Sequence, residues 1–303
     1  MFNIIGKRNL FFIITAVVVL ICIISLVTFG LKAGIEFSSG SVMTVGFEEK
    51  VEKVDISRAL SDLGYANAII QRVGDEDFLL RLPELNQQAK TELETELAAQ
   101  LGTLEVKEFD SVSPMVASET TRDAAIAVVV AGVGILLYIA WAFRRMPNPF
   151  RYGICALVAL THDALVALGV FSILGGILSW EINLMFVTGV LAVIGYSVNN
   201  TVVVFDRIRE NLTRETRVGF EATVNNSLVE TLSRSLNTSL TTLFVVLALL
   251  LFVGTSIQNF AVVLLIGIIA GTYSSLCIAP ALLVVWRSGE WSKYFPWRTQ
   301  PAD

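Results

Sequence analysis

Ionisable side chains lie inside one of the most apolar stretches of this 303-residue chain. The segment LTHDALV places His162, the only histidine, next to Asp163. Ionisable groups at membrane depth are costly and usually mark ion pathways or paired sites. The pair therefore predicts either a proton or ion relay or an anchor for hydrogen bonds between helices. Because adjacent helical positions point about 100° apart, we expect the two side chains not to form one tight site by themselves.

Two further polar positions interrupt apolar runs. In GYSVNNTVVVFDRIREN (residues 195–211), Asn199 and Asn200 precede a charged cytoplasmic motif that begins with Asp206 and Arg207. A buried amide needs hydrogen-bond partners that hydrocarbon cannot supply. Arg234 precedes the next apolar run, where it either extends to the membrane boundary or reaches inward to Asp163 or the asparagines. We expect these residues to form one polar network, with no metal and no cofactor.

The composition indicates a membrane protein. The chain is 54% hydrophobic and only 16% charged, whereas soluble domains carry roughly 25% charged residues. Residues 31–123 contain nine Lys/Arg and 18 Asp/Glu, so an acidic soluble insert is expected in a basic membrane scaffold. Nucleic-acid binding is disfavoured because no basic stripe with interleaved aromatic residues is present.

Six apolar stretches are long enough to cross a bilayer core of about 30 Å. They are Leu10–Phe29, Ala124–Phe143, Tyr152–Ile177, Leu184–Phe205, Ser235–Phe252 and Phe260–Trp286. The first exceeds the usual length of a signal-peptide core and has no cleavage-site pattern after it, so we expect a retained anchor. Residues 206–233, between the fourth and fifth stretches, are expected to form an interfacial amphipathic helix, with partner docking as a second possibility.

The distribution of basic residues predicts the orientation. Lys and Arg gather before the first span, after the second, after the fourth and in the tail, at Lys7, Arg8, Arg144, Arg145, Arg151, Arg207, Arg209, Arg214, Arg217, Arg287, Lys293 and Arg298. The opposite loops, 175–183 and 254–259, contain none. The positive-inside rule therefore places both termini in the cytoplasm and the acidic insert outside.

The insert shows the pattern of a small α+β domain. Alternation predicts strands over 41–47, 68–73, 78–82 and 104–112, and helical spacing predicts helices over 54–63 and 87–101. A turn is expected at 74–77. The order β-α-β-β-α-β is that of a ferredoxin-like domain. We therefore expect an α-helical integral membrane protein divided into residues 1–30, the extracytoplasmic domain 31–122, five further helices over 123–286, and a cytoplasmic tail, 287–303.

Several motifs together resemble the SecD/SecF family of protein-export membrane proteins, within the resistance-nodulation-division superfamily. They occur in the family's order: GIEFSSGS (34–41), VSPMVASE, LTHDALVALGVFSILG, IGYSVNNTVVVFDRIREN, SRSLNTSLTT and GTYSSLCIAP. The resemblance implies an auxiliary subunit of the Sec translocase, driven by proton or sodium motive force in the cytoplasmic membrane of a prokaryote. The implied partners are SecD, the SecYEG channel and the translocating preprotein, together with membrane lipid; YajC and YidC are further candidates.

The resemblance also implies roles for particular residues. Arg234 and the pair His162–Asp163 match the family pattern, and the family's fourth-span motif usually reads Asn-Asp where this chain has Asn199–Asn200. That Asp is implicated in ion coupling, whereas an amide does not titrate near neutral pH. On this view a SecD carboxylate would titrate, Asn200 would orient water or bind Na⁺, and Arg234 would respond to the change in charge.

The sequence disfavours two other functions. A stand-alone exporter of lipids or small apolar molecules is disfavoured, because such members of the superfamily usually have two six-span halves and larger external domains. An intramembrane hydrolase using His162 and Asp163 has no GxSxG or HExxH motif to support it, so we expect no enzymatic activity.

Overall fold

The computed structural model describes residues 3–73, 77–214, 219–252 and 257–289. The chain divides into two compact units, Met1–Lys32 with Ile126–Asp303, and Ala33–Ala125. We describe each unit by itself. Several sequence predictions fall partly or wholly outside the described residues: most of the turn at 74–77, Arg217, Lys293, Arg298, and part of the loop at 254–259.

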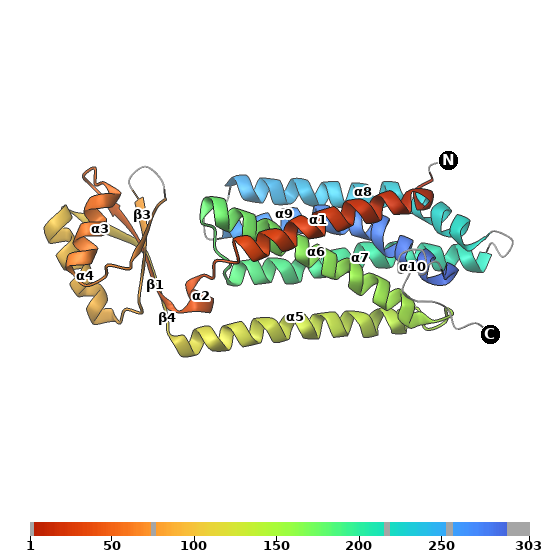
Figure 1. The fold of residues 1–303 in the computed structure, drawn as a ribbon, viewed down its shortest axis with the longest axis horizontal. Coiled ribbons are helices and arrows are strands. Elements are labelled where there is room, and N and C mark those ends of the chain that lie inside the picture. The colour runs from red at the N-terminus through yellow and green to blue at the C-terminus, as the bar shows by residue number, and fades with distance from the viewer. Residues whose placement is uncertain (1–2, 74–76, 215–218, 253–256, 290–303) are drawn as a thin grey trace. The chain divides into compact units, whose positions relative to one another are not determined.

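The larger unit is a helical bundle (Figure 1). Among the described residues, six helical stretches are long and apolar enough to cross a membrane, which confirms the six predicted spans. The first is α1, preceded by a short 3₁₀ helix, η1, and the last is an α9–η3–α10 run in which η3 is a π-helix. Their bounds are η1 Ile5–Lys7, α1 Arg8–Thr28, α5 Pro114–Ala142, α6 Pro149–Leu178, α7 Leu184–Arg214, α8 Phe220–Phe252, α9 Gln258–Tyr273, η3 Ser274–Ile278 and α10 Ala279–Ser288.

The helices of the bundle differ greatly in how much of their surface the others cover. About half of the most apolar window is buried in α6, in α7 and in the α9–η3–α10 run, but only 11% in α1 and α5 and 17% in α8. The first three therefore form the centre, and the other three present apolar side chains outward. Lipid tails are as apolar as these side chains, so such an exterior suits a bilayer.

Small residues bring helices of the bundle close together. A Cβ atom added to Gly169 of α6 would lie 2.3 Å from the Cβ of Cys22 in α1. One added to Gly267 of α9 would lie 2.1 Å from a methyl group of Val193 in α7. Glycine lets backbones approach where larger residues would collide, and this is how helices pack without a hydrophobic driving force.

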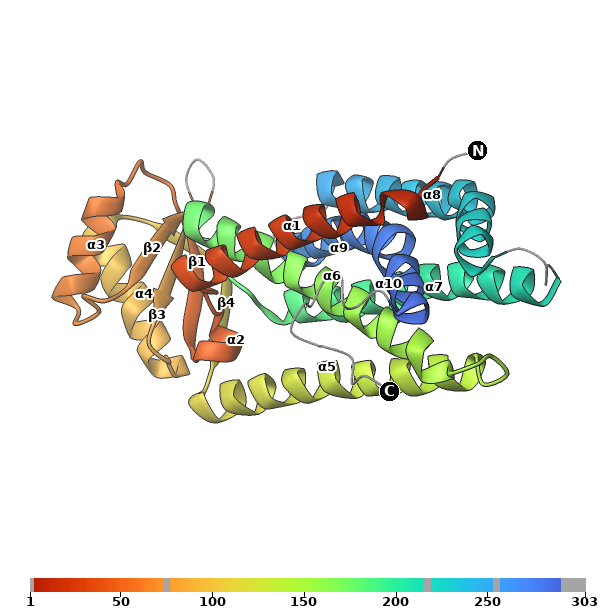
Figure 2. The ribbon, with the colours of Figure 1, turned by 45° about the vertical axis from the view of Figure 1, so that its right-hand side comes forward.

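The smaller unit is a four-stranded antiparallel sheet with two helices on one face (Figures 1 and 2). The strand order is β2-β3-β1-β4, and the chain order is β-α-β-β-α-β after a single-turn helix. This confirms the predicted ferredoxin-like topology. The bounds are α2 Ile35–Ser38, β1 Gly40–Phe47, α3 Lys53–Asp62, β2 Ile69–Arg72, β3 Asp77–Leu82, α4 Gln87–Leu101 and β4 Leu104–Val112.

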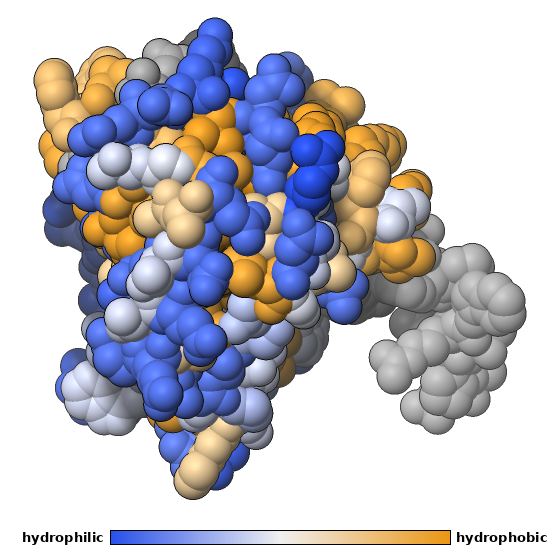
Figure 3. Space-filling model, turned by 90° about the vertical axis from the view of Figure 1, so that its left-hand side faces the viewer, coloured by the Kyte–Doolittle hydropathy of each residue, from blue (hydrophilic) through white to orange (hydrophobic). Residues whose placement is uncertain are grey.

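Alternation along the strands builds the core of this unit. Met43 and Val45 of β1 are fully buried and lie opposite Leu80 and Phe78 of β3. The same face packs against α3 and α4, whose Ile56, Leu60, Leu93 and Leu97 are also buried. Figure 3 shows the side of the molecule where α3 and α4 lie, with hydrophilic residues covering much of it. A water-facing domain has this character.

Three helices extend beyond their apolar stretches. The helix α5 begins at Pro114, ten residues before the predicted span, because proline is well suited to the first helical position and Ser113 accepts a hydrogen bond from Val116 N. The segment 206–233 is not one separate helix, as its described parts continue α7 to Arg214 and begin α8 at Phe220. In Figures 1 and 2, the first turns of α8 run at an angle to the rest.

Candidate functional site

Three separate spans converge on the carboxylate of Asp163. Asp163 lies in the middle of α6 and is 1% exposed. Ser197 of α7 donates a 2.6 Å hydrogen bond to Asp163 Oδ2, and Ser274 of η3 donates another of 2.8 Å to the same oxygen. Both serines are fully buried. A buried carboxylate is costly unless hydrogen bonds satisfy it, and these serines supply them.

His162 completes the shell of this carboxylate. Its Nδ1 lies 3.0 Å from Asp163 Oδ1, so the expectation that the adjacent side chains would not meet was wrong. The Cα–Cβ bonds diverge, but each side chain rotates about two further bonds, which is enough to bring a ring nitrogen onto a neighbouring carboxylate. The imidazole also lies 6.1 Å from the ring of Tyr273, whose hydroxyl donates to Phe11 O in α1.

The π-helix is a local irregularity at this site. Ser274–Ile278 interrupts the last span immediately after Gly271–Tyr273 and two residues before Pro280. Single-turn π segments within α-helices occur frequently at functional sites, because the extra residue re-aims side chains and loosens the backbone ladder. Here the segment begins at the residue that binds Asp163. The carboxylate is therefore hydrogen-bonded to the first residue of the irregular part of the span.

The two asparagines have different surroundings. Asn200 is 3% exposed, and its Nδ2 lies 3.5 Å from Ser239 Oγ of α8. Ser239 also accepts hydrogen bonds from Tyr196 and Thr272, at 3.1 and 2.7 Å. The Asn200 Oδ1 accepts no hydrogen bond from a described residue. Asn199 faces out of the bundle. Only Asn200 therefore joins the polar interior, and it does so beside the Asp163 cluster rather than within it.

Arg234 does not reach Asp163 in this structure. Arg234 is exposed on α8 and forms no ion pair with any described residue. Its backbone carbonyl accepts a 2.9 Å hydrogen bond from the Thr238 hydroxyl. The expectation of one network that includes Arg234 is thus not met within this chain. Its guanidinium is presented on the outer face of the bundle.

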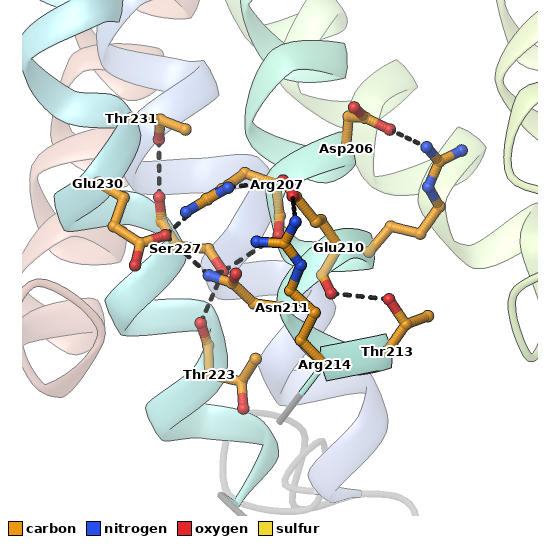
Figure 4. Close-up of polar contacts among 11 residues, drawn as sticks. Asp206, Arg207, Glu210, Asn211, Thr213, Arg214, Thr223, Ser227, Glu230 and Thr231 are labelled. Atoms are coloured by element: carbon orange, nitrogen blue, oxygen red, sulfur yellow. Dashed lines mark hydrogen bonds and ion pairs between the residues drawn. The ribbon is translucent and has the colours of Figure 1, made fainter. Parts of the chain in front are cut away.

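The motif after the fourth span forms a second polar cluster between α7 and α8 (Figure 4). Arg207 Nε lies 2.6 Å from Glu230 Oε2 of α8, and Arg207 Nη1 lies 2.6 Å from Glu210. The buried Asn211 donates to Ser227 at 3.0 Å and to Glu230 at 2.8 Å. Asp206 pairs instead with Arg209 in its own helix, at 2.6 Å. Arg207 therefore links two helices, whereas Asp206 does not.

Sequence reasoning missed the roles of Ser274 and Ser239. Ser274 belongs to GTYSSLCIAP, which the sequence identified only as a motif of the family. Two adjacent serines in an apolar span, six residues before a proline, were the available signal. Within the described ranges, no three His, Cys, Asp or Glu side chains lie close enough together to hold a metal ion.

These features define a multi-pass membrane protein that has the buried carboxylate of Asp163 in a polar core and also contains a ferredoxin-like unit. Residues 92–289 match the family described as "Protein export membrane protein SecD/SecF, C-terminal", and residues 24–51 match the "SecD/SecF GG Motif". The chain belongs to the SecD/SecF family.

Full-length relatives and a solved structure agree with this assignment. The chain is 43% identical to Protein translocase subunit SecF of Thermobaculum terrenum, over 99% of this chain and 98% of that protein. It is 40% identical to the protein of the same name from Anaerolinea thermophila, over the whole of both chains. A crystal structure of SecDF from Thermus thermophilus, described as a translocon-associated membrane protein, matches with a TM-score of 0.83 and 34% identity. That match covers 95% of this chain and 39% of the SecDF chain.

Proposed function

We propose that this protein is an auxiliary subunit of the Sec protein translocase, coupling ion movement through its membrane bundle to preprotein export. The observation that carries the coupling is the buried Asp163 carboxylate, held by hydroxyls from two other spans. Full-length relatives named as translocase subunits supply the context of export. The protein acts as an accessory subunit of a translocase and not as an enzyme.

The proposed membrane partner is SecD. The outer faces of α7 and α8 carry a row of small and polar residues at membrane depth, namely Thr188, Ala192, Gly195 and Asn199 on α7 and Arg234, Asn237, Thr238 and Thr241 on α8. Exposed to lipid, an amide or a guanidinium is costly, so a second protein is the better neighbour. The SecDF relative is more than twice as long as the part matched here, which suits a SecD-like half as that neighbour.

We further propose that both termini are cytoplasmic and that the ferredoxin-like unit lies outside, where it contacts the emerging preprotein. The clustering of arginines at one set of helix ends supports this orientation. The SecYEG channel, YajC and YidC are the proposed further partners. In this arrangement the unit outside moves when the bundle changes its protonation or ion occupancy.

Within the bundle, Asp163 and His162 respond to the coupling ion, and Asn200 orients water or binds Na⁺ through its free Oδ1. Arg234 faces a carboxylate of the SecD partner. This assignment follows the positions of the side chains: among the described residues of the bundle, the Asp163 carboxylate is buried, and Arg234 is exposed on α8. The stand-alone exporter remains disfavoured.

Preprotein translocation into membrane vesicles tests the proposal. Vesicles would contain SecYEG and SecD with or without this chain, and the proton and sodium gradients would be collapsed separately. We expect this chain to accelerate translocation only while one of the two gradients persists. An acceleration that survives loss of both gradients would exclude ion coupling. Failure of the chain to copurify with coexpressed SecD would exclude the proposed pair.

A further inference from the structure

A small cavity lies between the start of α6, the start of α8 and the end of α10. Its volume is about 100 Å³, and its lining includes Arg151, Tyr152, Phe220 and Arg287. No carboxylate of a described residue lines it. The cavity belongs neither to the Asp163 cluster nor to the Arg207 cluster, because it shares no residue with either.

The two arginines of this cavity contact aromatic rings but have no carboxylate partner among the described residues: the Arg151 guanidinium lies 5.9 Å from the centre of the Trp286 ring. Arg151 and Arg287 form no ion pair with a described residue, although Arg8, Arg207, Arg209 and Arg214 all do. The guanidinium of Arg287 lies 4.1 Å from the centre of the Phe220 ring. Tyr152 is only 3% exposed, and its hydroxyl makes no hydrogen bond with a described residue. A tyrosine hydroxyl without a protein partner is available to hydrogen-bond a ligand that enters the cavity.

The cavity lies where the spans end. The helix α6 begins at Pro149, and α10 ends at Ser288. Near the start of α8, Asn225 accepts a 2.8 Å hydrogen bond from Ile4 N, so the segment that precedes the first span lies at the same end of the bundle. Tyrosine and tryptophan are enriched where a span meets the headgroups, and Tyr152 and Trp286 flank this position. The cavity is therefore at headgroup depth.

The charges of the cavity favour an anion. Two arginines line the cavity at the N-terminus of α6, a 30-residue helix whose first N–H groups carry partial positive charge. Asn148, the residue before this helix, also lines the cavity. The planar fork of arginine matches the oxygens of a phosphate, and a tyrosine hydroxyl adds a neutral donor.

A strip of apolar surface next to the cavity indicates that the phosphate belongs to a lipid. Phe150, Ile154 and Val158 are 60%, 37% and 46% exposed and follow one face of α6 at intervals of four residues. The strip begins one residue before Arg151 and runs into the membrane, so an acyl chain can lie along it. We propose that this cavity binds the phosphate of an anionic phospholipid headgroup. Basic pockets between spans bind lipid headgroups in this way.

Native mass spectrometry of the full chain tests the site. The protein would be titrated with phosphatidylglycerol, with phosphatidylcholine of the same acyl chains, and with inorganic phosphate. The variants are Arg151→Gln, Arg287→Gln and Tyr152→Phe. The matched control is Arg144→Gln, which removes the same charge from an exposed side chain that does not line the cavity. Thermal unfolding of each variant verifies its fold.

We expect phosphatidylglycerol to bind best, and each cavity arginine variant to weaken it by about tenfold, the effect of one hydrogen bond to a charged group. Arg144→Gln should bind as the unaltered chain does. Equal weakening by all three arginine variants would show diffuse attraction instead of a site. Inorganic phosphate that displaces the lipid at equal concentration would assign the cavity to free phosphate and overturn the lipid proposal. If an arginine variant does not fold, the binding of phosphatidylglycerol to the Tyr152→Phe variant still tests whether the lipid occupies this cavity.

Discussion

Ser274 donates a 2.8 Å hydrogen bond to Asp163 from the first residue of a π-helix, across 111 positions of sequence. The contact joins the one buried carboxylate of the described membrane bundle to its most irregular backbone. Any change in the charge of Asp163 alters the hydrogen bond that holds η3. Under the proposed ion coupling, this contact is where a change at Asp163 would reach the geometry of the helix.

Loss of the Ser274 hydroxyl should destabilise the bundle. Ser274→Ala leaves Asp163 with one donor fewer, and hydrogen bonds to charged groups contribute about 1.5–3 kcal/mol. We expect a lower unfolding temperature in detergent and slower preprotein export. The control is Ser275→Ala, because Ser275 is equally buried in the same segment but its hydroxyl donates to the Thr272 carbonyl. Equal losses in the two variants would argue against a special role for the Asp163 contact.

The packing of α1 on α6 should tolerate no side chain at Gly169. An added Cβ would lie 2.3 Å from Cys22, so Gly169→Ala must force the helices apart, and overpacking of this kind costs about 1–3 kcal/mol. Gly134→Ala in α5 is the matched control, since its Cβ would meet no atom within 4 Å. The melting temperatures of the two variants should differ clearly, with only Gly169→Ala lowered. A Gly169→Ala protein as stable as the original would refute this packing.

The buried amide of Asn200 should matter for export more than a buried thiol does. Asn200→Ala removes a polar group from the interior, whereas Cys155→Ala removes only packing atoms from the apolar core. We expect slower translocation into vesicles for Asn200→Ala than for Cys155→Ala, at matched protein levels. Equal export rates for the two variants would end the proposed role of Asn200 in ion coupling.

The Arg207–Glu230 pair should hold α7 and α8 together beyond the spans. Arg207→Ala removes an interhelical ion pair, and we expect faster protease cleavage between these helices, with a smaller effect in high salt because exposed pairs are screened. Arg214→Ala is the control, since Arg214 pairs with Glu210 in its own helix. Cleavage that is unchanged in Arg207→Ala, or equally fast in both variants, would assign the link to other contacts.

Much of the fold could be predicted from the sequence because its elements depend on local patterns. The helix Gln87–Leu101 has the predicted bounds, and β1 differs from its predicted bounds by one residue. The extent of α7 could not be predicted from hydropathy, since charged residues carry the helix on from Phe205 to Arg214 through ion pairs at three- and four-residue spacing.

The site could be predicted only in part. His162, Asp163 and Asn200 were identified because polar residues stand out in apolar runs, and all three are buried. The pairing of Asp163 with Ser197 and Ser274 depends on how three helices rotate against one another, which no local pattern specifies. The same reason applies to Arg234: its position in the sequence left open an extension to the membrane boundary or an inward reach, and the rotation of α8 exposes it.

The most direct test of the central claim compares Asp163→Asn with the unaltered chain in vesicles that also contain SecYEG and SecD. Preprotein translocation is measured with the ion gradient imposed and with it collapsed. An amide keeps the size of the side chain and can still accept from Ser197, but it cannot gain or lose the ion. We predict that Asp163→Asn abolishes the acceleration by the gradient and leaves the gradient-independent rate unchanged. A variant that the gradient accelerates as strongly as the unaltered chain would contradict this account.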